Sequence, residues 1–270
     1  MAESFYVPEG DLYLATELTR GPWDPGAQHA GPPAALIGRE VERIGGGRIG
    51  GPDGPPAQVG RITYEVLRSV PIAPLRVEAR IVRPGRRVEM FEATLSDEDG
   101  ETLMRARGWR LRTEAIEFEA PESRVPPPPP PDAGEPGRFF HTGYDVGYHT
   151  AMEYRFAEGA FMEAGPAVVW MRMAVALLPG EEPSPLQRVL TAADSGNGVS
   201  AALDWQRYLF INVDLTVHLH RPPAGEWVCL DAETFPEGNG VGMADTRLLD
   251  ESGQIGRAVQ TLLVADRERA

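Results

Sequence analysis

The sequence contains no lysine, and all of its basic residues are arginine. Without lysine the protein cannot form a Schiff base with a carbonyl substrate or with pyridoxal phosphate, and it lacks the lysine that P-loop and kinase sites require. The sequence also has a single cysteine, Cys229. One cysteine excludes an intramolecular disulfide and a cysteine-rich zinc site.

Long apolar stretches are also missing. No run reaches the roughly 18 apolar residues of a membrane-spanning helix, and no N-terminal stretch resembles a signal peptide. We therefore expect a cytoplasmic protein without membrane insertion. Positive charge is scarce, because 26 basic residues against 40 acidic residues give a net charge of −14. Such a chain is not expected to bind nucleic acid or acidic membranes, which require a basic face.

Six consecutive prolines, Pro126 to Pro131, mark the clearest boundary in the chain. Consecutive prolines fix φ and remove backbone donors, so they predict a stiff polyproline II linker. A proline-rich ligand for a partner protein is the alternative interpretation. The predicted organisation is an N-terminal domain at 1–118, a linker at 119–137 and a C-terminal domain at 138–270.

The two halves repeat one pattern of strands. Apolar and polar residues alternate in 62–70, 75–83, 88–96 and 102–112, and again in 212–220, 227–235, 241–249 and 255–264. Pro71 and Pro222, which follow the first strand of each set, are 151 residues apart (222 − 71). Gly100 and Gly253, in the turns before the last strands, are 153 residues apart (253 − 100). We expect the two sheets to join side by side, because exposed sheet edges tend to pair.

A helix is predicted before each set of strands. Segment 32–44 has an apolar face. Segment 185–193 follows Ser184, a favourable N-cap, and is expected to continue toward residue 202. Strand-like stretches at 12–19, 144–156 and 168–177 precede the helices. This order predicts an α+β fold in which one helix lies across each antiparallel sheet.

Three segments resemble a known family. They are AQHAGPPAALIGRE at 27–40, LTAADSGNGVS at 190–200, and INVDLTVHLHRP at 211–222 together with GRAVQTLLV at 256–264. The spacing of Asp214, His220 and Arg221 is their most specific feature. The chain is similar to the thioesterase II (TesB-like) acyl-CoA thioesterases over nearly its whole length. This resemblance implies a double hotdog fold, with two antiparallel sheets that each wrap around a central helix.

The resemblance also implies an active site in which an aspartate, a threonine or serine, and a glutamine hold a water molecule. By position these residues are Asp194, Asn212 and Gln260, and Asn212 departs from the expected threonine or serine. The implied substrate is an acyl-CoA or a related thioester, with no cofactor and no metal. We further expect the protein to form a homodimer.

Four residues near the implied site are candidates for substrate binding. His29 and Gly31 lie where the first helix begins, and Gly196 and Gly198 follow Asp194. Glycine permits close approach of a ligand to the backbone.

Hydrolysis of a thioester needs a water nucleophile, a base and a hydrogen-bond donor for the developing oxyanion. We expect Asp194 to accept the proton, Asn212 and Gln260 to orient the water or the base, and backbone N–H groups at 195–198 to stabilise the oxyanion. These three side chains should converge on one cavity. The expected apolar channel is lined by residues such as Val199, Leu203, Trp205 and Met243.

The same residues also have structural interpretations. Asp194 resembles a helix-capping residue, Gln260 a buried amide and Asn212 an ordinary strand residue. Two groups of arginines are candidate sites for an anionic substrate or, alternatively, partners of nearby glutamates: Arg83, Arg86 and Arg87 at one turn, and Arg105, Arg107, Arg110 and Arg112 along one strand.

Other functional interpretations remain open. The GNGVSA segment at 196–201 matches a dinucleotide-binding pattern but lacks the preceding strand, and Ser195 lies in no nucleophile elbow. His218 and His220 share one strand face and could bind a metal with His141 or His149. A non-catalytic acyl-ligand binder, suggested by Asn212, and a hotdog enzyme of another reaction such as hydration are the rival functions.

Overall fold

The structure, a computed structural model, describes residues 3–119, 125–137, 142–161 and 163–268. Its described strands in the first half are β1 (Tyr6–Glu9), β2 (Leu12–Ala15), β3 (Ala57–Val66), β4 (Pro74–Arg83), β5 (Val88–Asp97) and β6 (Thr102–Arg112). Those in the second half are β7 (Glu135–Pro136), β8 (Met152–Glu158), β9 (Ala167–Met173), β10 (Tyr208–Asn212), β11 (Asp214–Leu219), β12 (Val228–Pro236), β13 (Val241–Asp250) and β14 (Gly253–Asp266). The helices are α1 (Gly31–Arg43), α2 (Tyr148–Ala151), α3 (Pro185–Ala193) and α4 (Gly196–Val199).

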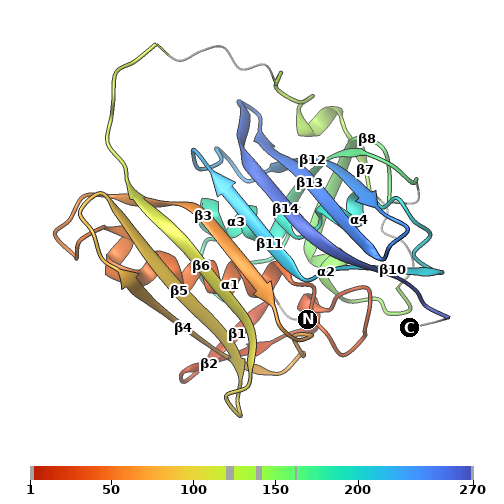
Figure 1. The fold of residues 1–270 in the computed structure, drawn as a ribbon, viewed down its shortest axis with the longest axis horizontal. Coiled ribbons are helices and arrows are strands. Elements are labelled where there is room, and N and C mark those ends of the chain that lie inside the picture. Colours follow the sequence, from red (N-terminus) through yellow and green to blue (C-terminus); the bar gives the residue numbers. More distant parts are fainter. Residues whose placement is uncertain (1–2, 120–124, 138–141, 162, 269–270) are drawn as a thin grey trace.

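All of these strands belong to one 14-stranded sheet (Figure 1). Its order is β1-β2-β4-β5-β6-β3-β11-β14-β13-β12-β9-β8-β7, and β10 also pairs with β14. The order β4-β5-β6-β3 in the first half is mirrored by β12-β13-β14-β11 in the second, as the sequence repeat predicts.

The two halves join where β3 pairs antiparallel with β11. Thr63 lies opposite Thr216 in this pairing, and their hydroxyls hydrogen-bond at 3.1 Å on the outer face. Ile62 and Val217, also opposite each other, point inward and are fully buried. The prediction that the sheets join side by side is therefore confirmed. Because the sheet is continuous, the domain boundaries at 1–118, 119–137 and 138–270 remain a prediction.

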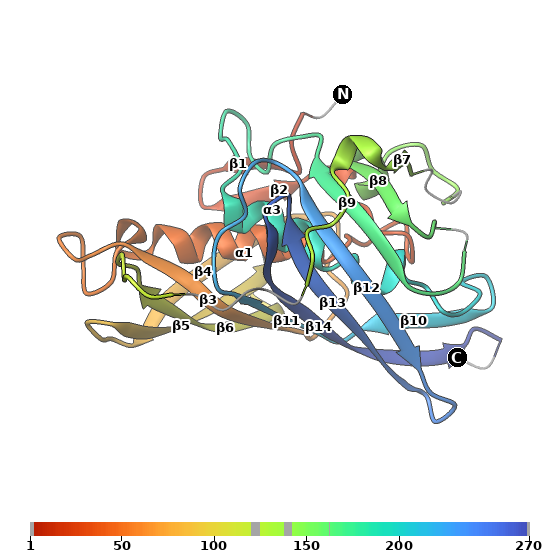
Figure 2. The same cartoon turned by 90° about the horizontal axis from the view of Figure 1, so that it is seen from above.

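Two helices lie against one face of the sheet. Figure 2 shows α1 and α3 together on that face. They run antiparallel, because Gly31 at the start of α1 meets Thr191 near the end of α3, whereas Glu42 at the end of α1 accepts hydrogen bonds from Ser184 before α3. The apolar faces of the two helices pack against the apolar side of the sheet and form the core with it.

Two predicted elements are interrupted in the structure. The predicted strand at 212–220 breaks at Val213, whose O accepts from Val66 N at 2.9 Å and whose N donates to Thr261 O at 3.0 Å. Leu215 and Val217 point inward, so strict alternation would place Asn212 on the outer face. The extra residue shifts the alternation and turns Asn212 inward, as a β-bulge does.

The second helical segment also ends earlier than predicted. The segment does not continue to residue 202: α3 ends at Ala193, Asp194 is its C-cap, and the chain forms the short helix α4 at Gly196–Val199. The predicted strand at 144–156 likewise contains the one-turn helix α2 before β8. No helix in the described part of the chain is long and apolar enough to cross a membrane.

The C-terminal part of the proline run lies against the second half of the sheet. The indole Nε1 of Trp170 donates to Pro129 O at 2.7 Å, and Pro131 is buried. Trp170 also packs with Cys229 and Leu249 in a small buried cluster. Burial raises the pKa of the Cys229 thiol, so this cysteine stays protonated.

The Asp214, His220 and Arg221 motif has a structural role. Asp214 accepts from the N–H and hydroxyl of Thr261, and Arg221 donates to both carboxylate oxygens of the fully buried Asp250. Burial by itself would raise the pKa of Asp250, but hydrogen bonds from Arg221 and from two backbone N–H groups outweigh it and lower the pKa. The motif therefore fixes the end of β11 to the turn between β13 and β14.

Replacing Asp250 by asparagine should lower the free energy of unfolding at neutral pH by about 3 kcal/mol, because Arg221 loses its charged partner. The pKa of Asp250 is lower in the folded state than in the unfolded state. Its contribution is therefore present above the ordinary carboxyl pKa and is lost as pH falls through the folded-state pKa. Urea denaturation should show the difference between wild type and variant shrinking as the pH falls below the ordinary carboxyl pKa. Equal midpoints at neutral pH would contradict this role.

Candidate active site

One cavity of about 350 Å³ lies between the two halves of the molecule. One group of its polar side chains comes from the segment before α1 (His29), from the region of α3 and α4 (Asp194, Ser195 and Asn197) and from β10 (Asn212). Six aromatic residues also line the cavity: Trp23, Tyr148, Tyr154, Phe161, Trp205 and Phe210. A mostly apolar pocket with a few converging polar groups is typical of a small-molecule site.

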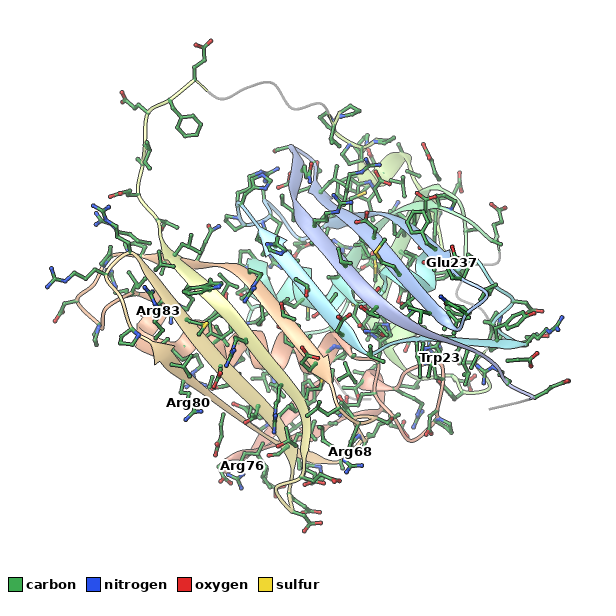
Figure 3. The ribbon with its side chains drawn as sticks, viewed as in Figure 1. Trp23, Arg68, Arg76, Arg80, Arg83 and Glu237 are labelled. Carbon is green, nitrogen blue, oxygen red and sulfur yellow. The ribbon has the colours of Figure 1, made fainter. Side chains whose placement is uncertain are left out.

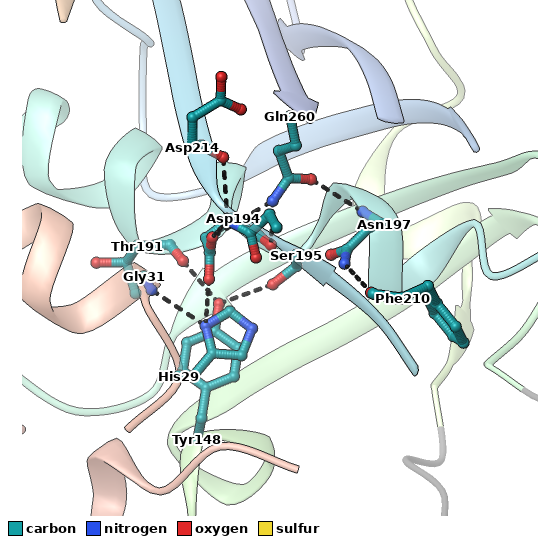
Figure 4. Close-up of polar contacts among 11 residues, drawn as sticks. His29, Gly31, Tyr148, Thr191, Asp194, Ser195, Asn197, Phe210, Asp214 and Gln260 are labelled. Carbon is teal, nitrogen blue, oxygen red and sulfur yellow. Dashed lines mark hydrogen bonds and ion pairs between the residues drawn. The ribbon is translucent and has the colours of Figure 1, made fainter. Parts of the chain in front are cut away.

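Asp194 is the centre of the polar groups (Figure 4). Its side chain is only 4% exposed. Asn212 Nδ2 donates to its Oδ1 at 2.9 Å, and Gln260 Nε2 lies 3.3 Å from the same oxygen and 3.1 Å from the backbone carbonyl oxygen. The three residues predicted from the sequence therefore come together, within hydrogen-bond distance. Asn212 reaches Asp194 because the break at Val213 turns it inward.

Gln260 lies behind Asp194 rather than in the cavity wall. It is 1% exposed, and its Oε1 accepts from Asn197 N at 3.1 Å while its Nε2 faces Asp194. The side-chain amide of Gln260 therefore hydrogen-bonds to Asp194 and to the start of α4. Gln260 is thus placed to position Asp194 and α4.

His29 is the fourth residue in contact with Asp194. Its Nδ1 lies 3.0 Å from Asp194 Oδ2, and its ring stacks on Tyr148 with centroids 3.8 Å apart and planes at 9°. Burial lowers the pKa of His29, and the negative charge of Asp194 opposes only part of this effect. At neutral pH the imidazole is therefore uncharged.

The four glycine and histidine candidates have different surroundings. A Cβ on Gly31 would lie 2.3 Å from Thr191 O, and one on Gly196 would lie 2.5 Å from Thr246 Oγ1. Glycine at these two positions is needed for close packing. Gly198 has open space around it and lines the cavity, as does His29, so these two are accessible to a ligand.

The predicted oxyanion donors at 195–198 are mostly occupied. Ser195 N donates to Ala192 O at 2.9 Å, Asn197 N to Gln260 Oε1 at 3.1 Å, and Gly198 N to Ser195 O at 3.0 Å. That prediction was wrong for these three groups, because the turn into α4 uses them.

The predicted channel is only partly correct. Val199 and Trp205 line the cavity, whereas Leu203 and Met243 do not. Met243 is 42% exposed on the outer face of β13.

Tyr148 is a site residue that the sequence did not indicate. Its hydroxyl donates to Thr191 O at 2.7 Å and lies 3.0 Å from Ser195 Oγ. Burial raises its pKa, so the hydroxyl remains protonated and keeps its hydrogen bond to Thr191 O. A one-turn helix carries this residue to the cavity, and no periodic pattern predicts so short a helix.

The repeat places a half-buried carboxylate, Glu42, at the position equivalent to Asp194. Glu42 precedes Asp194 by 152 residues (194 − 42), within the offset of the repeat. It accepts from Ser184 Oγ at 2.7 Å and from Gln187 Nε2 at 3.2 Å, beside a cavity of only about 190 Å³. Burial raises its pKa, outweighing those hydrogen bonds. Glu42 is therefore a matched carboxylate outside the larger cavity.

The arginines mostly pair with carboxylates. Figure 3 shows Arg76, Arg80 and Arg83 along β4 at the edge of the first half. Arg107 hydrogen-bonds to Glu92, and Arg112 and the buried Arg110 face Glu114 and Glu89. Arg68 also pairs with a carboxylate, that of Glu101 at 2.7 Å, and it lines the cavity.

The predicted alternative metal site is not assembled in the described residues. No three His, Cys, Asp or Glu side chains gather there as metal ligands would. His218 points outward from β11, and His149 stands in α2. His141 lies outside the described residues.

Comparison with known proteins identifies the family. The sequence matches the acyl-CoA thioesterase N-terminal domain over residues 19–111 and the acyl-CoA thioesterase C-terminal domain over residues 121–264. The chain belongs to the acyl-CoA thioesterase family, and it is a thioester hydrolase. No curated protein matches the sequence.

Solved structures share the fold over nearly the whole chain. A Thermobifida fusca protein described as a thioesterase II is 17% identical, with 97% of this chain and 96% of that chain covered and a TM-score of 0.73. A protein with the hot dog fold from Alicyclobacillus acidocaldarius is 16% identical (96% and 95% covered, TM-score 0.71). The acyl-CoA thioesterase II TesB2 of Mycobacterium marinum is 14% identical (97% and 94% covered, TM-score 0.64). The predicted double hotdog fold is confirmed.

Gly31→Ala should destabilise the protein, whereas Gly198→Ala should not. The new methyl group at position 31 would meet a backbone carbonyl, and overpacking of this kind typically costs about 1–3 kcal/mol. At position 198 the methyl group meets nothing within 4 Å. Thermal unfolding of both variants beside the wild type measures the difference. Equal melting temperatures for Gly31→Ala and wild type would show that α1 and α3 tolerate separation.

Proposed function

We propose that this protein hydrolyses an acyl-CoA thioester by attack of a water molecule assisted by Asp194. The observation that supports this most is the buried carboxylate of Asp194 at the polar end of an otherwise apolar cavity, held in one orientation by Asn212 and Gln260. A fixed carboxylate beside an acyl-sized pocket can position a water molecule. Its negative charge can also favour removal of a proton from that water.

The cavity suits the two parts of such a substrate. Its aromatic wall can bury an acyl chain, while Arg68 at the wall offers a positive charge to an anionic coenzyme A, despite the net charge of −14. Val199 and Gly198 leave space next to Asp194 for the thioester carbonyl.

In the proposed reaction, the water oxygen bonds to the thioester carbonyl carbon, and the C–S bond then breaks. A base in the site accepts one water proton and then gives a proton to the leaving thiolate, so that the products are a carboxylic acid and the free thiol. Asp194 stays a carboxylate and never bonds to the acyl group. Its negative charge stabilises the site while the proton is held there.

The test is the substitution Asp194→Asn, which keeps the size of the side chain and removes its charge. We expect kcat for acyl-CoA hydrolysis to fall by about 10²–10⁴-fold with KM little changed. Glu42→Gln is the matched control, because Glu42 is the half-buried carboxylate at the equivalent place in the first half and does not line the larger cavity. Steady-state assays over several acyl-chain lengths measure both variants.

Wild-type turnover by Asp194→Asn would sink the proposed mechanism. Binding of acyl-CoA without release of thiol by the wild type would support the rival function of an acyl-ligand binder. Formation of a hydrated acyl-CoA would support a hotdog hydratase.

Asn212 should be replaceable by threonine but not by valine. Threonine and valine have nearly the same shape, but only threonine can donate a hydrogen bond to Asp194 in place of Asn212 Nδ2. We expect Asn212→Thr to retain kcat within a few fold and Asn212→Val to lose roughly tenfold or more, since one hydrogen bond to a charged group contributes about 1.5–3 kcal/mol. Equal activity of the two variants would mean that the donor at this position does not matter.

A further inference from the structure

The contacts of His29 go beyond substrate binding. The imidazole is held on three sides: Nδ1 faces Asp194 Oδ2 at 3.0 Å, one ring face stacks on Tyr148 at 3.8 Å, and the backbone enters α1 two residues later. Its side chain is 14% exposed and forms part of the cavity wall. A ring fixed in this way presents its remaining polar atom, Nε2, in one direction.

The position of the proton on this ring follows from its neighbours. Nδ1 lies 3.0 Å from Asp194 Oδ2 and 3.1 Å from Gly31 N, and it cannot both donate to the carboxylate and accept from the N–H. A hydrogen bond to a charged acceptor is about twice as strong as one between neutral groups. This difference favours a proton on Nδ1 that is donated to Asp194, and it makes the contact with Gly31 N–H the weaker of the two.

Nε2 is then the unprotonated nitrogen. It makes no hydrogen bond within the described part of the chain. The oxygens of Asp194, in contrast, are engaged: Oδ1 faces Asn212 and Gln260, and Oδ2 faces His29. The open lone pair at the polar end of the cavity therefore belongs to His29.

We propose that His29 is the catalytic base of this enzyme, and that Asp194 acts by orienting the imidazole and stabilising its charged form. This inference rests on the proposed function, and it deepens the role of Asp194 there. The residue that accepts the water proton then comes from the first half of the chain, and the carboxylate that orients it comes from the second half.

The proton balance is complete with these two side chains. As the water oxygen bonds to the carbonyl carbon, Nε2 accepts one water proton, and the ring becomes an imidazolium that faces Asp194. When the C–S bond breaks, the electron pair leaves with sulfur and Nε2 returns the proton to the thiolate. The products are a carboxylic acid and a thiol, and His29 and Asp194 end in their starting states.

The acid limb of the activity profile reflects the groups around the ring. Asp194 faces Nδ1, and the ring of Tyr148, which carries a protonated hydroxyl, stacks on the imidazole. Asp24 is the other carboxylate of the cavity wall. Because burial lowers the pKa of His29, the ring is neutral at and above about pH 6.5 and kcat/KM should fall only below that value. Replacing His29 should remove this limb.

The first test is His29→Asn in the full-length protein, with acyl-CoA as substrate. The asparagine amide can still donate to Asp194 from near the position of Nδ1, but it has no basic nitrogen. We expect kcat to fall by about 10²–10⁴-fold with KM within a few fold. A residue that only positioned Asp194 would be replaced by asparagine with kcat within a few fold of wild type, and that result would overturn the proposal.

The second test is His29→Ala with added imidazole, which removes the side chain and leaves a cavity beside Tyr148. The rate should rise with the concentration of unprotonated imidazole, and no rise would overturn the proposal.

Asp194→Asn distinguishes the proposed function from the proposal that His29 is the base. If that variant is inactive while His29→Asn is active, the proposed function stands and His29 is not the base. If Asp194→Asn is fully active, the proposed function itself fails.

Discussion

The site depends on the close antiparallel contact between α1 and α3. A Cβ on Gly38 would lie 2.4 Å from Leu190 Cδ1, and one on Gly31 would lie 2.3 Å from Thr191 O, so α3 packs directly on the backbone of α1 at both glycines. This contact brings the start of α1 to the end of α3 and sets His29 3.0 Å from Asp194. Neither half of the chain contains the site alone, because the histidine comes from one half and the carboxylate from the other.

The internal two-fold arrangement explains why Asp194 has a counterpart, Glu42, at the equivalent place in the first half. Glu42 and Asp194 occupy matching helix ends, and Ser184 faces Glu42 much as His29 faces Asp194. The surroundings differ at the strand that follows: Val59 lines the smaller cavity, whereas Asn212, 153 residues later (212 − 59), donates to Asp194. A repeat that has diverged in this way keeps the fold in both halves and a polar site in one.

Much of the fold could be predicted from the sequence because strands in a half-buried sheet alternate apolar and polar residues. This alternation predicts the two four-strand sets, an apolar face and helix-start signals predict the two helices, and the resemblance indicates Asp194, Asn212 and Gln260. The break at Val213 could not be predicted, because hydrogen bonds to Val66 and Thr261, both distant in sequence, maintain it. The expected oxyanion donors failed for a local reason, since the unforeseen helix α4 uses their N–H groups. The role of Tyr148 depends on tertiary contacts alone.

A single turnover in water enriched in ¹⁸O tests the central claim most directly, namely that water attacks the thioester while Asp194 remains a free carboxylate. Enzyme in excess over acyl-CoA should release, in its first turnover, an acid that contains one ¹⁸O atom, and the protein should remain unlabelled. An unlabelled acid from the first turnover, with ¹⁸O found in the peptide that contains Asp194, would show that Asp194 bonds to the acyl group and would contradict the account.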